Sequence, residues 1–540
     1  MAAAHADSDE MKCSLQSIRQ NLLETSITTQ LVEIQSAQIK QQKSLEFLSK
    51  LECLYFFDSR KRKFNSTNTE KPVLLRKRVN AFDELSGYVA LSYTWAPSPS
   101  ETSRQVGGYQ VEQRRSSRFE PSPVRDNIFN RIRRYMEHTC ITYFWIDQHG
   151  IQQEDGEDKE IGMHAMDRVY SLSKHPVALL AEPIIESELQ FLVRILRGTL
   201  VHKSHMGFEL FPSTQLNVAS NAIRVLKKIT SDTWFTRGWT FQENYRAGTR
   251  MMLLIPHAPA LNKMKPREYL GCLDGELCIN SVRFHEEATK LCLAYQSRQP
   301  PAADLCGRIL SKAGRYSILL RNRDRSGQSS MTPTIVADLV NRELKTTWDR
   351  LPIAANCCQY SVRLNSTRLR KKGHSLSLSL LGLCLPNGEI LSNQPQQKAD
   401  VEAAQALSIA DFLKTQSFNK LRSPHPRHSL TFTKGCRFVE VKLTEEGVQT
   451  KGHLWKTNCL VPTNSFPPGD WYPGNPRNAL GLSEVWRLGH LANALRKCGE
   501  YDLSNQLRDL IDSEYDTNPC PTFSQEWQIR MAKLVAWAAH

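Results

Sequence analysis

Apolar residues in this chain form short runs that alternate with stripes of helical spacing. Residues 141–146 are almost wholly apolar, as is typical of a strand covered on both faces. An acidic loop follows, and after it come apolar residues spaced as one buried face of a helix: Ile161, Ala165, Val169 and Leu172. Strand, loop and helix are half of a parallel β–α–β unit, in which ligands bind beyond the carboxyl ends of the strands. We therefore expect any chemistry to centre on Asp147, the residue that follows the strand.

The same alternation extends over residues 72–256. Apolar runs predict further strands at 88–95, 176–181 and 251–255. Apolar residues at helical spacing predict helices around 128–136, 161–172 and 222–229. Strands that alternate with helices are the pattern of an α/β structure with a mostly parallel sheet and flanking helices. We expect one such domain over 72–256.

Helical patterns dominate on both sides of this domain. From 11 to 57 the apolar spacing is helical, which predicts an N-terminal helical arm over residues 1–60. A mainly helical region is expected over 257–540, with a β hairpin near 438–455. Residues 374–385 fit either a strand or a helix, and their leucine content favours a helix. Amphipathic helices are predicted at 482–496, 503–513 and 523–538.

Length and composition narrow the class of protein. A chain of 540 residues is too long for one core, and 40% hydrophobic with 23% charged residues is the composition of a chain that folds. The sequence has no apolar run of the roughly 18 residues that span a bilayer, and its N-terminus lacks the apolar core of a signal peptide. These absences predict no transmembrane segment and a cytoplasmic location.

The net charge raises the question of an anionic partner. A formal charge of +15 at pH 7 would attract nucleic acid, anionic lipid or phosphorylated ligands. The basic clusters are spread along the chain, however, and none carries interleaved aromatic residues that could stack on bases. Solvated basic faces are the favoured interpretation and nucleic acid is not the expected partner, while a basic nucleic-acid-associated factor stays an alternative.

Familiar cofactor and metal motifs are absent. The sequence has no GxGxxG, GxxxxGK[ST] or GxSxG pattern and no Cys/His cluster at zinc spacing. His149 and His164 flank the acidic loop, but neither has a partner at ligand spacing. We expect no metal site, and the cofactor is left unassigned.

Three segments carry a resemblance to a known family: YVALSYTW at 88–95, WIDQHGIQQED at 145–155 with MDRVY at 166–170, and RGWTFQE at 237–243. Together and in this order they resemble the heterokaryon incompatibility (HET) domain of filamentous fungi. The resemblance implies programmed cell death triggered when unlike fungal individuals fuse, and action through self-association or a protein partner. HET domains are held to be distantly similar to TIR domains, which have a flavodoxin-like sheet of parallel strands. That fold agrees with the pattern of strands and helices above.

Three positions depart from what the family commonly has. Ala96 stands where a glycine is common, Gly150 where a cysteine is common, and Gly162 where a glutamine is frequent. If the family's cysteine were a nucleophile, this chain could not use it.

Two carboxylates are the candidate catalytic residues. Asp147 could bind a ribose hydroxyl, hold a cation or orient a base; alternatively it bonds the backbone amides of the following turn. Glu243 could stabilise positive charge or activate water; alternatively it forms a capping box with Thr240. Both alternatives are ordinary structural roles for these residue types.

Three further residues are candidates for binding a nucleotide. Trp95 and Trp239 could stack on its ring, although large aromatic side chains more often belong to a core. Arg237 could pair with a phosphate or with Glu243. By the resemblance to TIR domains, these residues and the two carboxylates would form a site that cleaves the glycosidic bond of NAD, so NAD would be a substrate.

Overall fold

The computed structural model describes residues 11–22, 25–57, 71–83, 87–101, 104–114, 116, 118–204, 207–315, 318–319, 331–389, 398–415, 439–451 and 482–515. The chain divides into two compact units, residues 1–451 and residues 452–540. The helix predicted at 523–538 lies outside the described residues.

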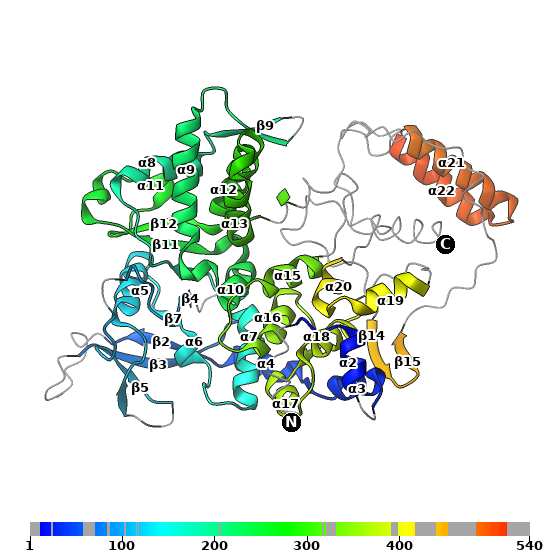
Figure 1. The fold of residues 1–540 in the computed structure, drawn as a ribbon, viewed down its shortest axis with the longest axis horizontal. Helices are drawn as coiled ribbons and strands as arrows, with labels where there is room; N and C mark the ends of the chain where they lie inside the picture. The colour runs from blue at the N-terminus through cyan, green and yellow to red at the C-terminus, as the bar shows by residue number, and fades with distance from the viewer. Residues whose placement is uncertain are drawn as a thin grey trace. The chain divides into compact units, whose positions relative to one another are not determined.

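A nine-stranded sheet is the centre of the first unit (Figure 1). Its strands are β2 (Leu51–Phe56), β3 (Val73–Val79), β4 (Tyr88–Ser92), β5 (Gln110–Glu112), β6 (Phe119–Pro121), β7 (Tyr143–Trp145), β8 (His175–Leu179), β11 (Met252–Pro256) and β12 (Glu276–Asn280). Side by side they run β12, β11, β8, β4, β7, β2, β3, β5, β6. The four strands predicted from the sequence, β4, β7, β8 and β11, are neighbours in it.

The directions of the strands confirm the predicted class of fold. β11, β8, β4 and β7 are parallel, and β3 and β5 run in the same direction as these four. Numbered along the chain, the four central strands lie in the order 2-1-3-4, as in flavodoxin-like sheets. β2, β6 and β12 run the other way. The sheet is therefore mostly parallel, as the alternation of apolar runs predicts.

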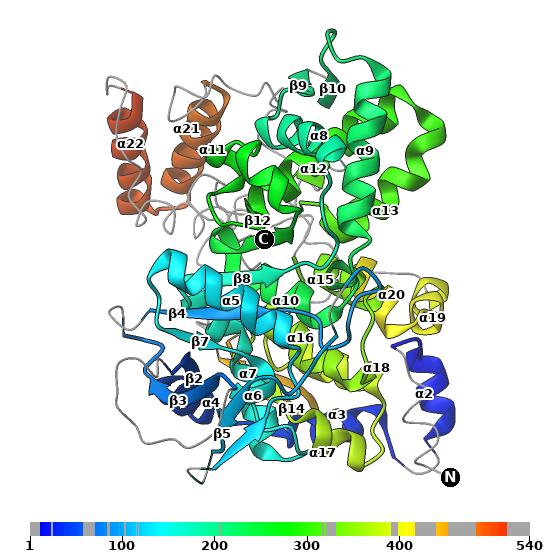
Figure 2. The ribbon, with the colours of Figure 1, turned by 90° about the vertical axis from the view of Figure 1, so that its left-hand side faces the viewer.

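Helices cover both faces of the sheet (Figure 2). On one face, Val89 and Leu91 of β4 pack with α5 (Asp126–Thr139). On the other face, Tyr88 and Ala90 belong to a core built with α7 (Glu157–Leu172), α8 (Glu186–Arg197), α9 (Leu216–Thr230) and α12 (Ser281–Arg298). All of β4 is buried as a result, which explains why this strand carries no charged residue.

Short elements connect these helices to the strands. They are α6 (Asp147–Gly150), the hairpin β9 (Val201–Ser204) and β10 (Gly207–Leu210), η2 (Thr233–Phe235), α10 (Gly238–Ala247), η3 (Gly248–Arg250), η4 (Pro259–Lys263) and α11 (Arg267–Leu270). Part of the acidic loop belongs to α7, because Glu157, Asp158 and Glu160 stand in its first turn. Carboxylates at this end of a helix interact favourably with its dipole.

The N-terminal arm is helical in three pieces: α2 (Leu15–Asn21), α3 (Ile27–Gln35) and α4 (Gln41–Ser49). Beyond α4 the predicted helical pattern to residue 57 is wrong, because residues 51–56 form β2, between β3 and β7. Leu51, Cys53 and Leu54 are buried there, and such a short apolar run fits a covered strand as well as a helix. The arm also supplies β1 (Gln38–Ile39), which pairs with β13 (Arg363–Leu364).

The region after β12 is mainly helical, as predicted. It contains η5 (Pro300–Ala302), α13 (Ala303–Ala313), α15 (Met331–Val340), η6 (Thr347–Asp349), α16 (Arg350–Cys357), α17 (Ser366–Lys371), α18 (Leu376–Cys384), α19 (Lys398–Ala406) and α20 (Ile409–Thr415). The helix favoured at 374–385 is confirmed by α18. The hairpin predicted near 438–455 is confirmed by β14 (Val439–Thr444) and β15 (Gly447–Lys451), which pair antiparallel.

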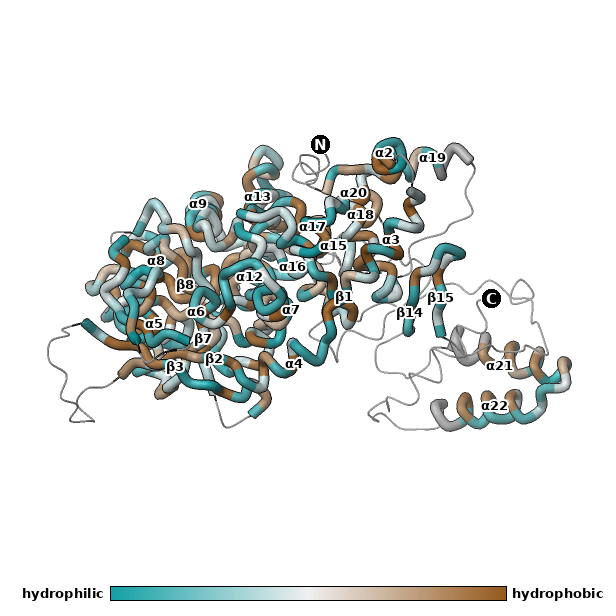
Figure 3. Tube along the Cα trace, turned by 90° about the horizontal axis from the view of Figure 1, so that it is seen from below, coloured by the Kyte–Doolittle hydropathy of each residue, from teal (hydrophilic) through white to brown (hydrophobic). Residues whose placement is uncertain are grey.

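In the second unit the structure describes residues 482–515, which form the helices α21 (Leu482–Lys497) and α22 (Tyr501–Tyr515), close to the predicted positions. Leu491, Leu495 and Leu507 form their shared core, and the Ser504 hydroxyl donates to the carbonyl of Ala492 at 2.8 Å. Hydrophobic and hydrophilic residues alternate along both helices in Figure 3, as expected of an amphipathic pair. Over the described residues of the whole chain, each helix falls short of the length or the apolar character that a membrane crossing needs.

Candidate active site

The candidate site lies at the carboxyl ends of the central parallel strands. Ser92 is the last residue of β4, and Asp147 begins α6 two residues after the end of β7. In flavodoxin-like sheets the ligand crevice lies at this edge, beside the first strand, where the strand order reverses. β4 is the first of the four parallel strands and lies between β7 and β8. The fold therefore places Asp147 where the sequence predicts chemistry.

Asp147 is held by two hydrogen bonds and stays half-buried. Its Oδ2 accepts from Trp95 Nε1 at 2.7 Å, and its Oδ1 accepts from the backbone N–H of Gln148 at 2.7 Å. The Gln148 side chain in turn accepts from the hydroxyl of Tyr93 at 2.6 Å. Burial raises the pKa of Asp147 to about 6, against the lowering effect of these hydrogen bonds and of the positive charge of Arg237.

Glu243 of α10 lies deeper, with 4% of its surface exposed. The Ser92 hydroxyl accepts from Trp234 Nε1 at 2.7 Å and donates its own hydrogen to Glu243 Oε2 at 2.5 Å. Burial, followed by the negative charge of Asp147, raises the pKa of Glu243 to about 8. Hydrogen bonds from Ser92 and Tyr170 and the charge of Arg237 oppose this rise without cancelling it.

The two carboxyl groups are therefore in different states near neutral pH. With pKa values of about 6 and about 8, Asp147 is mostly ionised at pH 7 and Glu243 is mostly protonated. Environments that push two neighbouring pKa values apart are typical of a base and an acid in one active site. The arrangement can hold one negative charge and one exchangeable proton side by side.

The capping-box interpretation of Glu243 is wrong in this structure. Helix α10 begins at Gly238 with Arg237 as its N-cap, so Thr240 is already inside the first turn. The Thr240 hydroxyl donates to the carbonyl of Arg237 at 3.1 Å and to that of Trp234, while the Glu243 carboxyl accepts from Ser92. The N-cap lies three residues before the Thr240 position that the pattern requires, and the Glu243 carboxyl group is bonded within the site and takes no part in capping the helix.

Arg237 supplies positive charge beside the two carboxyl groups. Its side chain is half-buried, and its charge lowers the pKa of both Asp147 and Glu243. Among the described residues, no hydrogen bond or ion pair engages its guanidinium, including none with Glu243. A guanidinium with open donors can receive a phosphate or carboxylate in a bidentate fashion.

The two tryptophans lie in different surroundings. Trp95 is 42% exposed and donates its indole N–H to Asp147, so its ring borders the site and faces solvent. Buried Arg125 fixes this loop by donating to the carbonyl of Trp95 at 2.5 Å. Trp239 instead donates to Asp349 Oδ2 at 2.9 Å and packs between two hydrophobic clusters. The structure thus brings Trp95 to Asp147 and ties Trp239 to the region after the sheet.

Several residues of the site were missed by the sequence patterns: Ser92, Tyr93, Gln148, Tyr170 and Trp234. All but Trp234 lie inside the three motif segments, and Trp234 lies three residues before the last. Ser92 belongs to the small-residue face of a strand, and the burial of Tyr93 and Tyr170 resembles that of core residues. Only the folded arrangement shows that their hydroxyls reach polar groups of the site.

Two of the three departures from the family pattern are explained by packing. A Cβ at Gly150 would lie 2.8 Å from Cε2 of Trp145, and a Cβ at Gly162 would lie 2.8 Å from Cγ2 of Ile151. Both distances are too short for any side chain unless the neighbour moves. Ala96 is exposed, so a side chain is accommodated there. In this structure position 150 has no room for a thiol.

Metal ligands are not gathered in the described part of the chain, where no group of three or more His, Cys, Asp or Glu side chains is arranged to hold an ion. His149 is occupied by a contact of 2.8 Å between its Nε2 and the Ser122 hydroxyl. Burial and the charges of Arg76 and Arg114 lower its pKa to about 3, so its ring is neutral.

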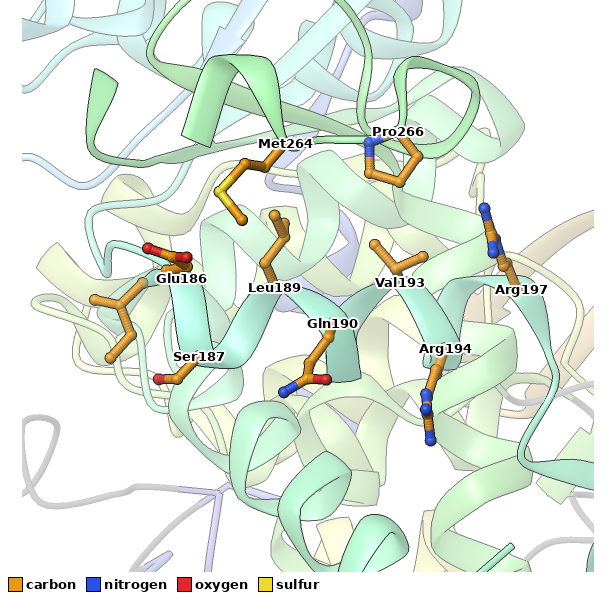
Figure 4. Close-up of a pocket in the computed structure, with 10 residues that line it drawn as sticks. Glu186, Ser187, Leu189, Gln190, Val193, Arg194, Arg197, Met264 and Pro266 are labelled. Atoms are coloured by element: carbon orange, nitrogen blue, oxygen red, sulfur yellow. The ribbon is translucent and has the colours of Figure 1, made fainter. Parts of the chain in front are cut away.

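An open hollow of about 850 Å³ lies elsewhere in the first unit. Leu189 and Val193 of α8 face Met264 and Pro266 across it, with Arg194 and Arg197 toward one end (Figure 4). None of the predicted site residues lines this hollow.

Comparison with known proteins gives one match. Residues 88–243 match the family model described as "Heterokaryon incompatibility protein (HET)". No curated protein and no solved structure matches the chain. The matched segment begins with β4 and ends at Glu243, so it contains both carboxyl groups of the site, and the likeness to TIR domains stays a prediction.

Proposed function

This chain is a HET-domain protein, with the domain over residues 88–243, and on this premise we propose that it acts in the cell death that follows fusion of unlike fungal individuals. The family match supports this role, because it includes all three motif segments in one continuous stretch. We propose that the protein acts inside the cell and signals through self-association or a protein partner.

The role is tested by expressing the full chain in a filamentous fungus and measuring growth and membrane integrity. Asp147→Asn is the test variant, and Asp155→Asn is the matched control, because Asp155 is exposed and pairs only with Lys159 one turn away in what the structure describes. Growth arrest with the wild type and the control but not with Asp147→Asn is the expected result. Normal growth with all three, even when the chains are forced to cluster, would contradict the proposal.

We further propose that the domain hydrolyses the glycosidic bond between ribose and nicotinamide in NAD. The observation that carries this proposal is that Asp147, at the carboxyl end of the parallel strands, is close enough for its charge to raise the pKa of Glu243, which leaves one group ionised and the other protonated. The exposed ring of Trp95 and the open guanidinium of Arg237 add surfaces for a base and a phosphate.

The chemistry of this reaction suits a single ionised carboxylate. As the bond from ribose C1′ to nicotinamide breaks, its electron pair leaves with nicotinamide, and positive charge develops on the ribose. Ionised Asp147, half-buried and reachable by solvent, can stabilise that charge. A water oxygen then bonds to C1′, and its proton passes through Asp147 to solvent. Glu243 keeps its proton, so that only one carboxylate of the pair carries charge.

The enzymatic proposal is tested by incubating the purified full chain with NAD and measuring free nicotinamide by chromatography. Asp147→Asn should lower the rate by roughly a hundredfold or more, the usual contribution of such a group. Asp155→Asn should leave it unchanged, since Asp155 lies in the exposed loop. Absence of nicotinamide from a folded, self-associated sample would refute catalysis and leave the binding role alone.

A further inference from the structure

The backbone on both sides of Arg237 is bonded to a segment that lies outside the HET match. The N–H of Glu343 donates to the carbonyl of Thr236 at 2.9 Å, and the N–H of Gly238 donates to the carbonyl of Glu343 at 3.1 Å. Arg237 and Glu343 thereby form a parallel bridge, to which the Thr236 hydroxyl adds a bond of 3.1 Å to Glu343 Oε2. We call residues 342–349 the clamp.

Side chains reinforce this backbone bridge. Trp239 Nε1 donates to Asp349 Oδ2 at 2.9 Å, and the Arg342 guanidinium lies 4.9 Å from the centre of the Phe241 ring. The close approach depends on Gly238, because a Cβ there would lie 2.8 Å from Cδ2 of Leu344. The first turn of α10 is therefore held by the clamp through hydrogen bonds, a cation–π contact and close packing.

The clamp is linked to the candidate site through Arg237. The backbone of this residue is bonded to the clamp, and its charge lowers the pKa of Asp147 and Glu243. Within the described residues no hydrogen bond holds the guanidinium itself, so the clamp acts on Arg237 through the backbone that carries it. Burial raises the pKa of Asp349 to about 6, and the Trp239 hydrogen bond and the charge of Arg237 oppose that rise. The charge of Arg237 therefore acts on Asp349 of the clamp as well as on Asp147 of the site.

We infer that the clamp is part of the site, with Asp349 as a positioning residue that acts through Trp239 to hold Arg237 where it binds the anionic group of a phosphate-bearing substrate. This inference rests on the proposed function for its substrate. The HET-matched segment alone contains the carboxyl groups but not the residues that fix the cation beside them.

Limited digestion of the full chain with trypsin tests the clamp without any substrate, because trypsin cleaves after Arg237. Trp239→Phe removes the donated hydrogen bond but keeps most of the ring area. Loss of one such bond should raise cleavage between Arg237 and Gly238 roughly tenfold, measured by mass spectrometry. Asp349→Asn keeps an acceptor oxygen for Trp239 and should raise it only roughly twofold to threefold.

Trp348→Phe is the matched control, because within the described residues the indole N–H of Trp348 has no acceptor. This variant loses buried ring area inside the clamp, next to Asp349, but loses no hydrogen bond, so it separates the effect of lost packing from that of the lost Trp239 hydrogen bond. Cleavage after Arg237 that rises equally in Trp239→Phe and Trp348→Phe, or in neither, would overturn the inference.

Kinetics with NAD separates the clamp from the proposed activity. If Arg237 binds a phosphate, Trp239→Phe should raise KM roughly tenfold and change kcat less than twofold, whereas a fall in kcat at constant KM would overturn the positioning role. A wild-type protein that releases no nicotinamide refutes the enzymatic proposal. In that case the rate of trypsin cleavage after Arg237 alone tests whether the clamp holds this residue.

Discussion

Replacing Glu243 by Gln should make the protein more stable at alkaline pH. The folded protein keeps the Glu243 proton up to a pKa of about 8, whereas the unfolded chain releases it near the ordinary value of 4.5. The folded state therefore binds more protons throughout this window, and stability is lost as the pH rises from 4.5 to 8. Glutamine resembles the protonated acid in shape, can still accept from Ser92 and does not titrate.

The size of the effect follows from the difference in pKa. Each unit corresponds to about 1.4 kcal/mol. Between pH 5 and pH 9 the wild-type protein should lose about 4 kcal/mol of unfolding free energy at this group, and Glu243→Gln should lose none of it. The two proteins should thus be nearly equal in stability at pH 5, and the variant should be the more stable at pH 9.

Urea titrations of both full chains at pH 5, 7 and 9 measure this difference. The comparison of variant and wild type cancels the other titrating groups, which the two chains share. Glu157→Gln is the matched control for exchanging a glutamate for a glutamine, since the Glu157 side chain is 60% exposed. A stability difference between Glu243→Gln and wild type that stays constant from pH 5 to pH 9 would show that Glu243 is not held protonated.

Three further results are expected from the same geometry. The rate of NAD cleavage measured against pH should rise near pH 6, as Asp147 ionises, and fall near pH 8, as Glu243 loses its proton; a flat profile would contradict the assignment. Ser92→Ala removes a donor to ionised Glu243 and should move the alkaline limb to higher pH, with a stability cost of about 1–3 kcal/mol seen in urea titration; an unmoved limb would exclude this role of the hydroxyl. Gly150→Ala places a methyl group against Trp145 and should destabilise the protein by about 1–3 kcal/mol, measured by thermal unfolding. An unchanged Tm would show that the indole ring moves aside without loss of stability.

The class of fold could be predicted because the central strands are covered on both faces. β4, β7, β8 and β11 are short apolar runs for that reason, and helical stripes separate them in the sequence. The sequence predicts helix where β2 lies, because the apolar residues of this short segment fit the spacing of a helix as well as that of a strand. Only its pairing with β3 and β7 decides between the two. Pairing between strands distant in the chain leaves no local signal.

The candidate site could be predicted in part. Asp147 could be predicted because it directly follows the apolar run 141–146 and because the carboxyl ends of parallel strands meet at one edge of a sheet. The hydrogen-bond partner of Glu243 could not be predicted, because Ser92 lies 151 positions earlier in the chain and no local sequence pattern connects the two. The same holds for Asp349, which lies 110 positions after Trp239 and outside the three motif segments.

Two buried glutamates in the segment that matches the HET family model have opposite pKa shifts because their surroundings differ. Burial alone would raise the pKa of Glu160 on α7, yet hydrogen bonds with His164, Ser366 and Thr367 outweigh it and lower the pKa to about 2. The Ser366 and Thr367 hydroxyls donate to one oxygen, Oε1, at 2.6 and 2.7 Å, and Glu160 therefore stays ionised at every pH near neutrality and holds α17.

Glu243 is buried to a similar degree but has fewer donors. The Ser92 oxygen accepts the indole hydrogen of Trp234, and the Ser92 hydroxyl donates its own hydrogen to Glu243. Hydroxyl groups alone do not compensate for burial beside the charge of Asp147, so the proton stays on Glu243 until about pH 8. A buried acid that is saturated with donors has a fixed charge and can only support structure. A buried acid that is left short of donors, next to a second carboxylate at the edge of a parallel sheet, keeps a proton that can exchange, and this difference is the physical basis for placing the chemistry at Glu243 and Asp147 rather than at Glu160.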